Sequence, residues 1–73
     1  MTDKIMLGKN IRKWRVLRDL KQNDFAKMLN ISVSTLSNYE NDKGNITLAQ
    51  LQKIIVALNI TFDQLIKDPV ELI

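Results

Sequence analysis

A short polar row is the part of this chain best suited to chemistry. Ser34, Ser37 and Asn38 follow one another at i, i+3 and i+4, which places their side chains on one face of a helix, and Val33 stands beside them. Hydroxyl and amide groups both donate and accept hydrogen bonds, and an amide matches the donor and acceptor that adenine displays in the major groove. A valine methyl group can meet the thymine methyl group. These four residues are therefore predicted to contact base edges.

Two short helices joined by a tight turn are expected to carry this row. The apolar spacing predicts the first helix over residues 22–29 and the second over residues 33–41. Between them, Asn30 tolerates the left-handed backbone that ends a helix, and Ser32 is a favoured N-cap for the next one. Because the connection is so short, the two helices must cross closely. A bihelical unit of this size, with a polar outer face, suits the reading of a DNA groove.

Phosphate contacts are expected from polar residues around this unit. Gln22 stands at a helix N-terminus, where free amides and the helix dipole favour an anion. Lys21 adds a positive charge beside it. The weaker phosphate candidates are Thr35, Asn41 and Lys43. For Lys43, a solvated loop lysine is an almost equally good interpretation.

The pattern as a whole resembles the helix-turn-helix of the phage repressor and Cro family, also called the xenobiotic-response-element type. The matching residues of the bihelical unit are Gln22, Ala26, Ile31, Ser32, Leu36 and Glu40. The similarity extends from Met6 to Lys67. It implies a lambda-repressor-like fold and binding to double-stranded DNA.

The same resemblance implies one ion pair and reveals three departures. The family pairs the positions of Arg15 and Glu40, so a structural salt bridge is expected between these two side chains. The family usually has Ser or Thr at the position of Lys21, Gly at Asn30 and Pro at Ile46. Lys21 loses a helix cap but brings a positive charge to a place where a phosphate is expected.

The charge is unevenly distributed along the 73 residues, whose net charge is +3. Residues 1–27 hold eight basic and three acidic side chains, whereas residues 28–73 hold three basic and five acidic ones. A basic surface attracts polyanions and speeds their encounter. Taken alone, however, this pattern is equally well explained by a solvated helix surface.

Several functions find no support in the composition. The chain has no Cys and no His, so neither a disulfide framework nor a Cys-based metal site is expected. No cofactor and no small-molecule effector are indicated, and no arrangement of nucleophile and base suggests an enzyme. The longest apolar run, Ile54 to Leu58, is too short to cross a membrane. The N-terminus lacks a signal-peptide layout. The absence of Cys suits a reducing cytosol, and a cytoplasmic location is expected.

The whole chain is predicted to form a single all-α domain, a compact five-helix bundle. The helices are expected at residues 3–18, 22–29, 33–41, 48–58 and 62–67, followed by an apolar tail at residues 68–73. Trp14 stands on an apolar helix face, so core packing is a better interpretation of it than base stacking. No repeat or linker interrupts the chain.

The chain is expected to be a sequence-specific DNA-binding transcriptional regulator that acts as a repressor. Its third helix is expected to lie in the major groove of a two-fold operator. The alternative is a protein-interaction module with the same fold, such as an antitoxin or a bridging cofactor. A homodimer is expected through apolar residues left over after the core is filled: Ile60, Phe62, Ile66, Val70, Leu72 and Ile73. The competing interpretation is that Phe62 and Ile66 complete the monomer core.

Overall fold

The computed structural model describes residues 7–67, and every regular element in this range is an α-helix. The helices are α1 (Leu7–Leu17), α2 (Gln22–Leu29), α3 (Val33–Glu40), α4 (Leu48–Leu58) and α5 (Phe62–Ile66). The all-α class and the order of five helices predicted from the sequence are confirmed. None of the helices described combines the length and hydrophobicity needed to cross a bilayer.

The helix ends differ slightly from the sequence prediction. Residues 3–6 of the first predicted helix and the tail at residues 68–73 lie outside the described residues. Helix α1 ends at Leu17 because the chain turns at Asp19, whose φ of 56° is left-handed. Asn41 and Lys67 were expected as the last residues of their helices, and they are instead the C-cap residues of α3 and α5.

The turn between α2 and α3 has the backbone that its residues predict. Asn30 adopts the left-handed conformation, with φ 57° and ψ 44°, and its N–H bonds back to the carbonyl of Lys27. The Ser32 side chain then accepts a hydrogen bond from the Thr35 amide at 3.0 Å. Side-chain capping satisfies an amide that the helix cannot satisfy itself. These local contacts fix the direction in which α3 leaves the turn.

The starts of α4 and α5 are capped differently, although both have Thr at the N-cap and Gln three residues later. At the start of α5, Thr61 Oγ1 accepts from the Gln64 amide at 3.1 Å, and Gln64 Oε1 accepts from the Thr61 amide at 2.8 Å. At the start of α4, Thr47 Oγ1 accepts from the Gln50 amide at 3.1 Å. The Gln50 side chain does not return the bond, and its buried oxygen has no partner among the described residues. The reciprocal pair of bonds, a capping box, therefore forms at α5, and only one of its two bonds forms at α4.

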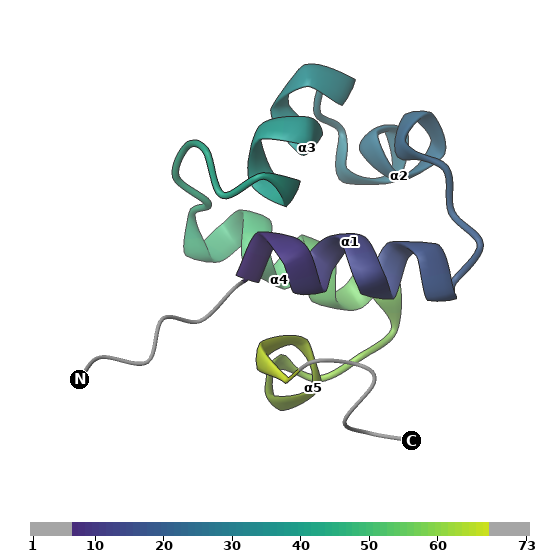
Figure 1. Ribbon diagram of the computed structural model, residues 1–73, viewed down its shortest axis with the longest axis vertical. Coiled ribbons are helices and arrows are strands. Elements are labelled where there is room, and N and C mark those ends of the chain that lie inside the picture. The colour runs from purple at the N-terminus through teal and green to yellow at the C-terminus, as the bar shows by residue number, and fades with distance from the viewer. Residues whose placement is uncertain (1–6, 68–73) are drawn as a thin grey trace.

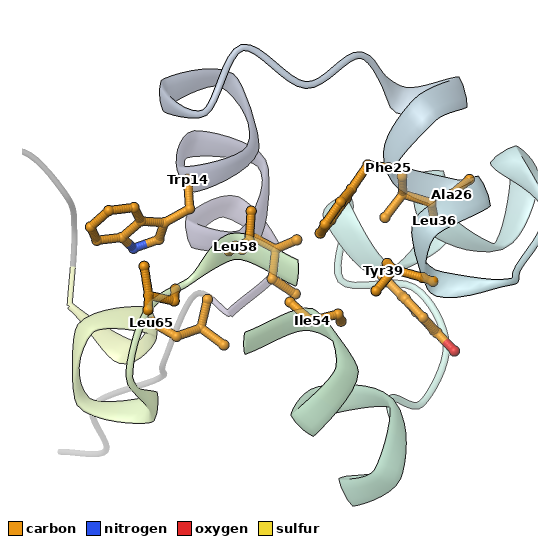
Figure 2. Close-up of a cluster of buried hydrophobic side chains, with 11 residues drawn as sticks. Trp14, Phe25, Ala26, Leu36, Tyr39, Ile54, Leu58 and Leu65 are labelled. Carbon is orange, nitrogen blue, oxygen red and sulfur yellow. The ribbon is translucent and has the colours of Figure 1, made fainter. Parts of the chain in front are cut away.

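A continuous apolar core joins the five helices. Figure 2 shows Ile54 and Leu58 of α4 between Trp14 and Leu65 on one side and Phe25 on the other. The buried apolar residues are Ile11, Trp14, Phe25, Ala26, Leu29, Leu36, Tyr39, Ile54, Leu58, Ile60 and Leu65. Helix α4 thus connects the two ends of the core. Buried residues of α2 and α3 belong to the same core, which holds these two helices in place.

Ile60 belongs to this core, with only 8% of its surface exposed. The left-handed Asn59, at φ 56°, reverses the chain after α4, and the Ile60 amide bonds to the Ile55 carbonyl at 3.2 Å. The prediction that Ile60 is left over for a dimer interface is therefore wrong. Phe62 remains 49% exposed and Ile66 is half-buried.

Two hydrogen bonds fasten α5 to α1. Asn10, itself buried, donates from Nδ2 to the Leu65 carbonyl at 3.0 Å. The Trp14 indole nitrogen donates to the Gln64 carbonyl at 3.1 Å. Trp14 is thus a core residue, as the sequence indicates. Helix α5 is held in a fixed position against the rest of the domain.

Gly8 of α1 lies directly against the end of α3. A Cβ atom at this position would overlap the Tyr39 carbonyl oxygen and lie 2.8 Å from Asp42 Oδ1. Asp42 follows α3 in a left-handed conformation, with φ 57°, and its Oδ1 accepts from the Gly8 amide at 3.0 Å. Glycine is therefore required for this approach, which fixes α3 relative to α1.

Candidate nucleic-acid interface

Helix α3 presents the predicted polar row at the surface. Val33, Ser34 and Asn38 are exposed and Ser37 is half-buried, while Leu36 beneath them is fully buried. Figure 1 shows α3 at one end of the molecule and α5 at the other. The outer face of α3 is therefore open to a large partner without interference from α5.

The side chains of this row differ in how freely they can bind a partner. Within residues 7–67, Ser34 and Asn38 make no side-chain hydrogen bond. Ser37 accepts from Asn41 Nδ2, at 2.8 Å on its carbonyl and 3.4 Å on its hydroxyl. The Thr35 hydroxyl lies 2.8 Å from the Ser32 hydroxyl. Asn38 thus keeps both halves of its amide available, whereas Asn41 and Thr35 are already engaged.

Arg15 and Glu40 form the ion pair that the resemblance implies. Arg15 Nε donates to Glu40 Oε2 at 2.7 Å, and Nη2 donates to Oε1 at 3.3 Å. The side chains are only 11% and 3% exposed. Arg15 Nη1 also donates to the Leu20 carbonyl at 2.7 Å. The pair joins α1 to the last turn of α3 and is largely shielded from water.

The start of α2 is left open. Lys21 is its N-cap residue, with an extended backbone and no side-chain capping bond. The first amide to bond within the helix is that of Phe25, to the Lys21 carbonyl at 2.9 Å, so the preceding amides find no helical partner. The Gln22 side chain donates from Nε2 to Glu40 Oε1 at 3.1 Å. An anion could therefore satisfy the free amides beside Gln22.

A polar depression of about 380 Å³ lies where α1, α2 and the end of α3 meet. It is lined by Arg12, Arg15, Gln22, Glu40 and Asn41. The structure thus brings together two of the predicted phosphate contacts, Gln22 and Asn41. The other three, Lys21, Thr35 and Lys43, do not line this depression.

Arg12 is the one lining residue of this depression that was not predicted from the sequence as a functional residue. Its spacing from Arg15 could have indicated it, since residues at i and i+3 are neighbours on a helix surface. The described part of the chain contains no group of three side chains suited to hold a metal ion. The depression is thus suited to an anion, because four of its five lining side chains carry N–H donors.

The chain is similar to a known protein family, to a characterised relative and to a solved structure. A helix-turn-helix family model matches residues 11–65. The control protein C.MunI from Mycoplasma sp is 36% identical over 66 residues, a match that covers 89% of each chain. The crystal structure of the restriction-modification controller protein C.Esp1396I superposes with a TM-score of 0.76 at 25% identity, covering 92% of each chain.

One further relative bears on the alternative function. The antitoxin PezA from Streptococcus pneumoniae serotype 4 is 35% identical over 57 residues. This match covers 78% of the present chain but only 36% of the antitoxin. The shared part is therefore the helix-turn-helix region, and most of the antitoxin has no counterpart in the match.

Proposed function

The chain belongs to the helix-turn-helix family, and we propose that it is a sequence-specific, DNA-binding transcriptional regulator. In this proposal it acts in the cytoplasm, as a repressor rather than as an enzyme. Helix α3 enters the major groove, where Val33, Ser34, Ser37 and Asn38 meet base edges. Residues at the start of α2 and beside α3 position the protein on the phosphates: Lys21, Gln22, Thr35, Asn41 and Lys43.

The observation that carries this proposal is the open polar face of α3. Asn38 is exposed and makes no side-chain hydrogen bond to another described residue. Directly beside this face, the uncapped start of α2 offers free amides to a phosphate. The proposed base-reading and phosphate-binding groups therefore lie on adjacent elements, which supports docking of a helix-turn-helix.

A two-fold operator is the second part of the proposal. One helix-turn-helix reads only a half-site, and dimers bind two half-sites about one helical turn apart. The exposed Phe62 and the half-buried Ile66 of α5 supply apolar surface at the end of the molecule opposite α3 (Figure 1). Val70, Leu72 and Ile73, which lie outside the described residues, are proposed to extend this interface.

The relatives of matched length suggest a more specific role. C.MunI, which the match covers over 89% of its length, is a control protein, and C.Esp1396I is a restriction-modification controller protein. We extend the proposal to a controller of this kind. The antitoxin function remains the second candidate, favoured by the match to PezA, although that match covers 36% of the antitoxin.

Selection of bound sequences from a random pool of duplex DNA tests the proposal. A DNA-binding regulator is expected to enrich one sequence with two-fold symmetry. For a controller, the same sequence should occur upstream of a restriction or methyltransferase gene in the source genome. A pool that remains random after repeated selection would contradict sequence-specific binding and would favour the protein-interaction alternative.

A further inference from the structure

Arg12 is an exposed cation without a structural role in the described part of the chain. It lies on α1, one turn before Arg15, and lines the polar depression between α1, α2 and α3. Among residues 7–67, no side chain pairs with it by hydrogen bond or ion pair. Its guanidinium group therefore keeps all five N–H donors available.

The charges around the depression make Arg12 its source of positive charge. Arg15 and Glu40 neutralise each other through two hydrogen bonds, of 2.7 and 3.3 Å. Of the five lining residues, two are cationic and one is anionic, so the lining carries a net charge of +1. With the ion pair closed, this charge belongs to Arg12.

Arg15 itself has few donors left for an external anion. Its Nε and Nη2 face Glu40, and its Nη1 donates to the Leu20 carbonyl at 2.7 Å. The Gln22 amide uses one N–H on Glu40 and keeps a second one. An anion in the depression would thus meet Arg12 and the remaining Gln22 N–H, beside the uncapped start of α2.

We propose that Arg12 binds a backbone phosphate of the DNA duplex at this depression, together with Gln22 and the start of α2. The planar fork of a guanidinium group matches two phosphate oxygens. The proposal rests on the proposed function and adds α1 to the DNA-contacting elements. Because the contact is with a phosphate, it should contribute affinity and positioning without sequence preference.

The substitution Arg12→Gln tests this contact through the salt dependence of DNA binding. Loss of one phosphate contact should reduce the slope of log affinity against log salt by about 0.9. If the variant and the wild type bind equally in 1 M salt, this change in slope corresponds to about an eightfold loss of affinity in 0.1 M salt. The preferred sequence should not change. Arg12→Lys keeps the charge and should restore the slope. Both variants should unfold at the same temperature as the wild type.

Lys53→Gln is the matched control, because it removes one positive charge from an exposed position. Lys53 lies on α4 and lines a different, mainly apolar depression with Met28 and Val56. It should leave the salt slope unchanged.

If Arg12→Gln behaves like Lys53→Gln while the wild type binds its selected site, the phosphate contact is absent and the proposed function stands. A change in preferred sequence would show a base contact and also overturn the proposal. A wild type that binds no duplex would refute both.

Discussion

At the scale of single residues, Asn38 has the environment expected of a base-reading side chain. It is exposed on α3, with its amide free of other described residues, while Leu36 and Tyr39 of the same helix are buried. We predict that Asn38→Ala reduces affinity for the selected site by about 1–3 kcal/mol and relaxes the preference at one base position. Quantitative binding followed by renewed sequence selection measures both effects.

The control for Asn38 is Gln52→Ala, which removes another exposed amide, this time from α4. It should change neither affinity nor sequence preference. If Asn38→Ala selects the same sites as the wild type with equal affinity, α3 does not read bases through the face assigned to it.

The ion pair between Arg15 and Glu40 should stabilise the fold. Both side chains are shielded, and removal of one partner leaves the other charge buried. We predict that Arg15→Ala and Glu40→Ala each lower the free energy of unfolding by about 3–5 kcal/mol, and that the double mutant loses less than the sum. Denaturant unfolding of the three variants gives the coupling energy.

Arg12→Ala on the same helix is the control for the loss of an arginine side chain. Since Arg12 is exposed and unpaired among residues 7–67, its removal should change stability by less than about 0.5 kcal/mol. Strictly additive effects of Arg15→Ala and Glu40→Ala would show that the two charges do not act as a pair.

The two arginines also illustrate what the sequence can reveal at this scale. The pairing of Arg15 with Glu40 was predicted only through the family resemblance, because the residues are 25 positions apart. The proposed role of Arg12 depends on that pairing, since Glu40 neutralises Arg15 and leaves Arg12 as the available cation of the depression. No local pattern reports which of two neighbouring arginines is neutralised by a distant carboxylate.

At the scale of secondary-structure elements, the start of α2 is a position where stability and binding have different requirements. Lys21 occupies the N-cap with an extended backbone but offers no capping oxygen. We predict that Lys21→Ser raises the free energy of unfolding by about 0.5–2 kcal/mol through a new capping bond. The same change should weaken binding to all DNA sequences alike and reduce the salt slope by about 0.9.

Lys21→Ala separates the two effects, because it removes the charge without adding a cap. It should weaken DNA binding as much as Lys21→Ser does, with no gain in stability. Thermal unfolding and salt-dependent binding of the two variants provide the comparison. Equal stability of the variants would mean that serine does not cap α2, and unchanged salt slopes would mean that Lys21 is not near a phosphate.

The helix ends show which structural features the sequence predicts. Asn30 adopts the expected left-handed conformation and Ser32 caps α3 as expected, because their contacts link residues only a few positions apart. The bond from Gly8 to Asp42 spans 34 positions and was not predicted, although it fixes the distance between α1 and α3. Local chemistry thus predicts the elements, whereas their spacing depends on contacts that only the folded chain brings together.

At the scale of the whole molecule, the described residues separate two surfaces. The polar face of α3 lies at one end and the exposed Phe62 of α5 at the other, with α1 and α4 crossing between them (Figure 1). Helix α1 links both ends, through Arg15 to Glu40 and through Asn10 and Trp14 to the backbone of α5. A partner bound at α5 would therefore have a fixed position relative to α3.

This arrangement leads to a prediction about assembly. A dimer formed through α5 would bury Phe62, which is 49% exposed, and would leave both α3 helices free. We predict that the wild type sediments as a dimer at micromolar concentration, because the exposed Phe62 and the half-buried Ile66 of α5 offer apolar surface to a second copy. Phe62→Ser, combined with truncation after Lys67, should shift the protein to a monomer and weaken binding to a two-fold site.

Val56→Ser provides the control, because Val56 is 78% exposed on α4 and its replacement also removes an apolar side chain from the surface. This variant should remain dimeric if α5 forms the interface.

A dimer that survives Phe62→Ser and the truncation would place the interface on another surface. A wild type that stays monomeric at every concentration, yet binds the two-fold site normally, would show that the second copy is recruited by the DNA. In that case the exposed Phe62 would contribute to cooperativity on the operator rather than to a preformed dimer.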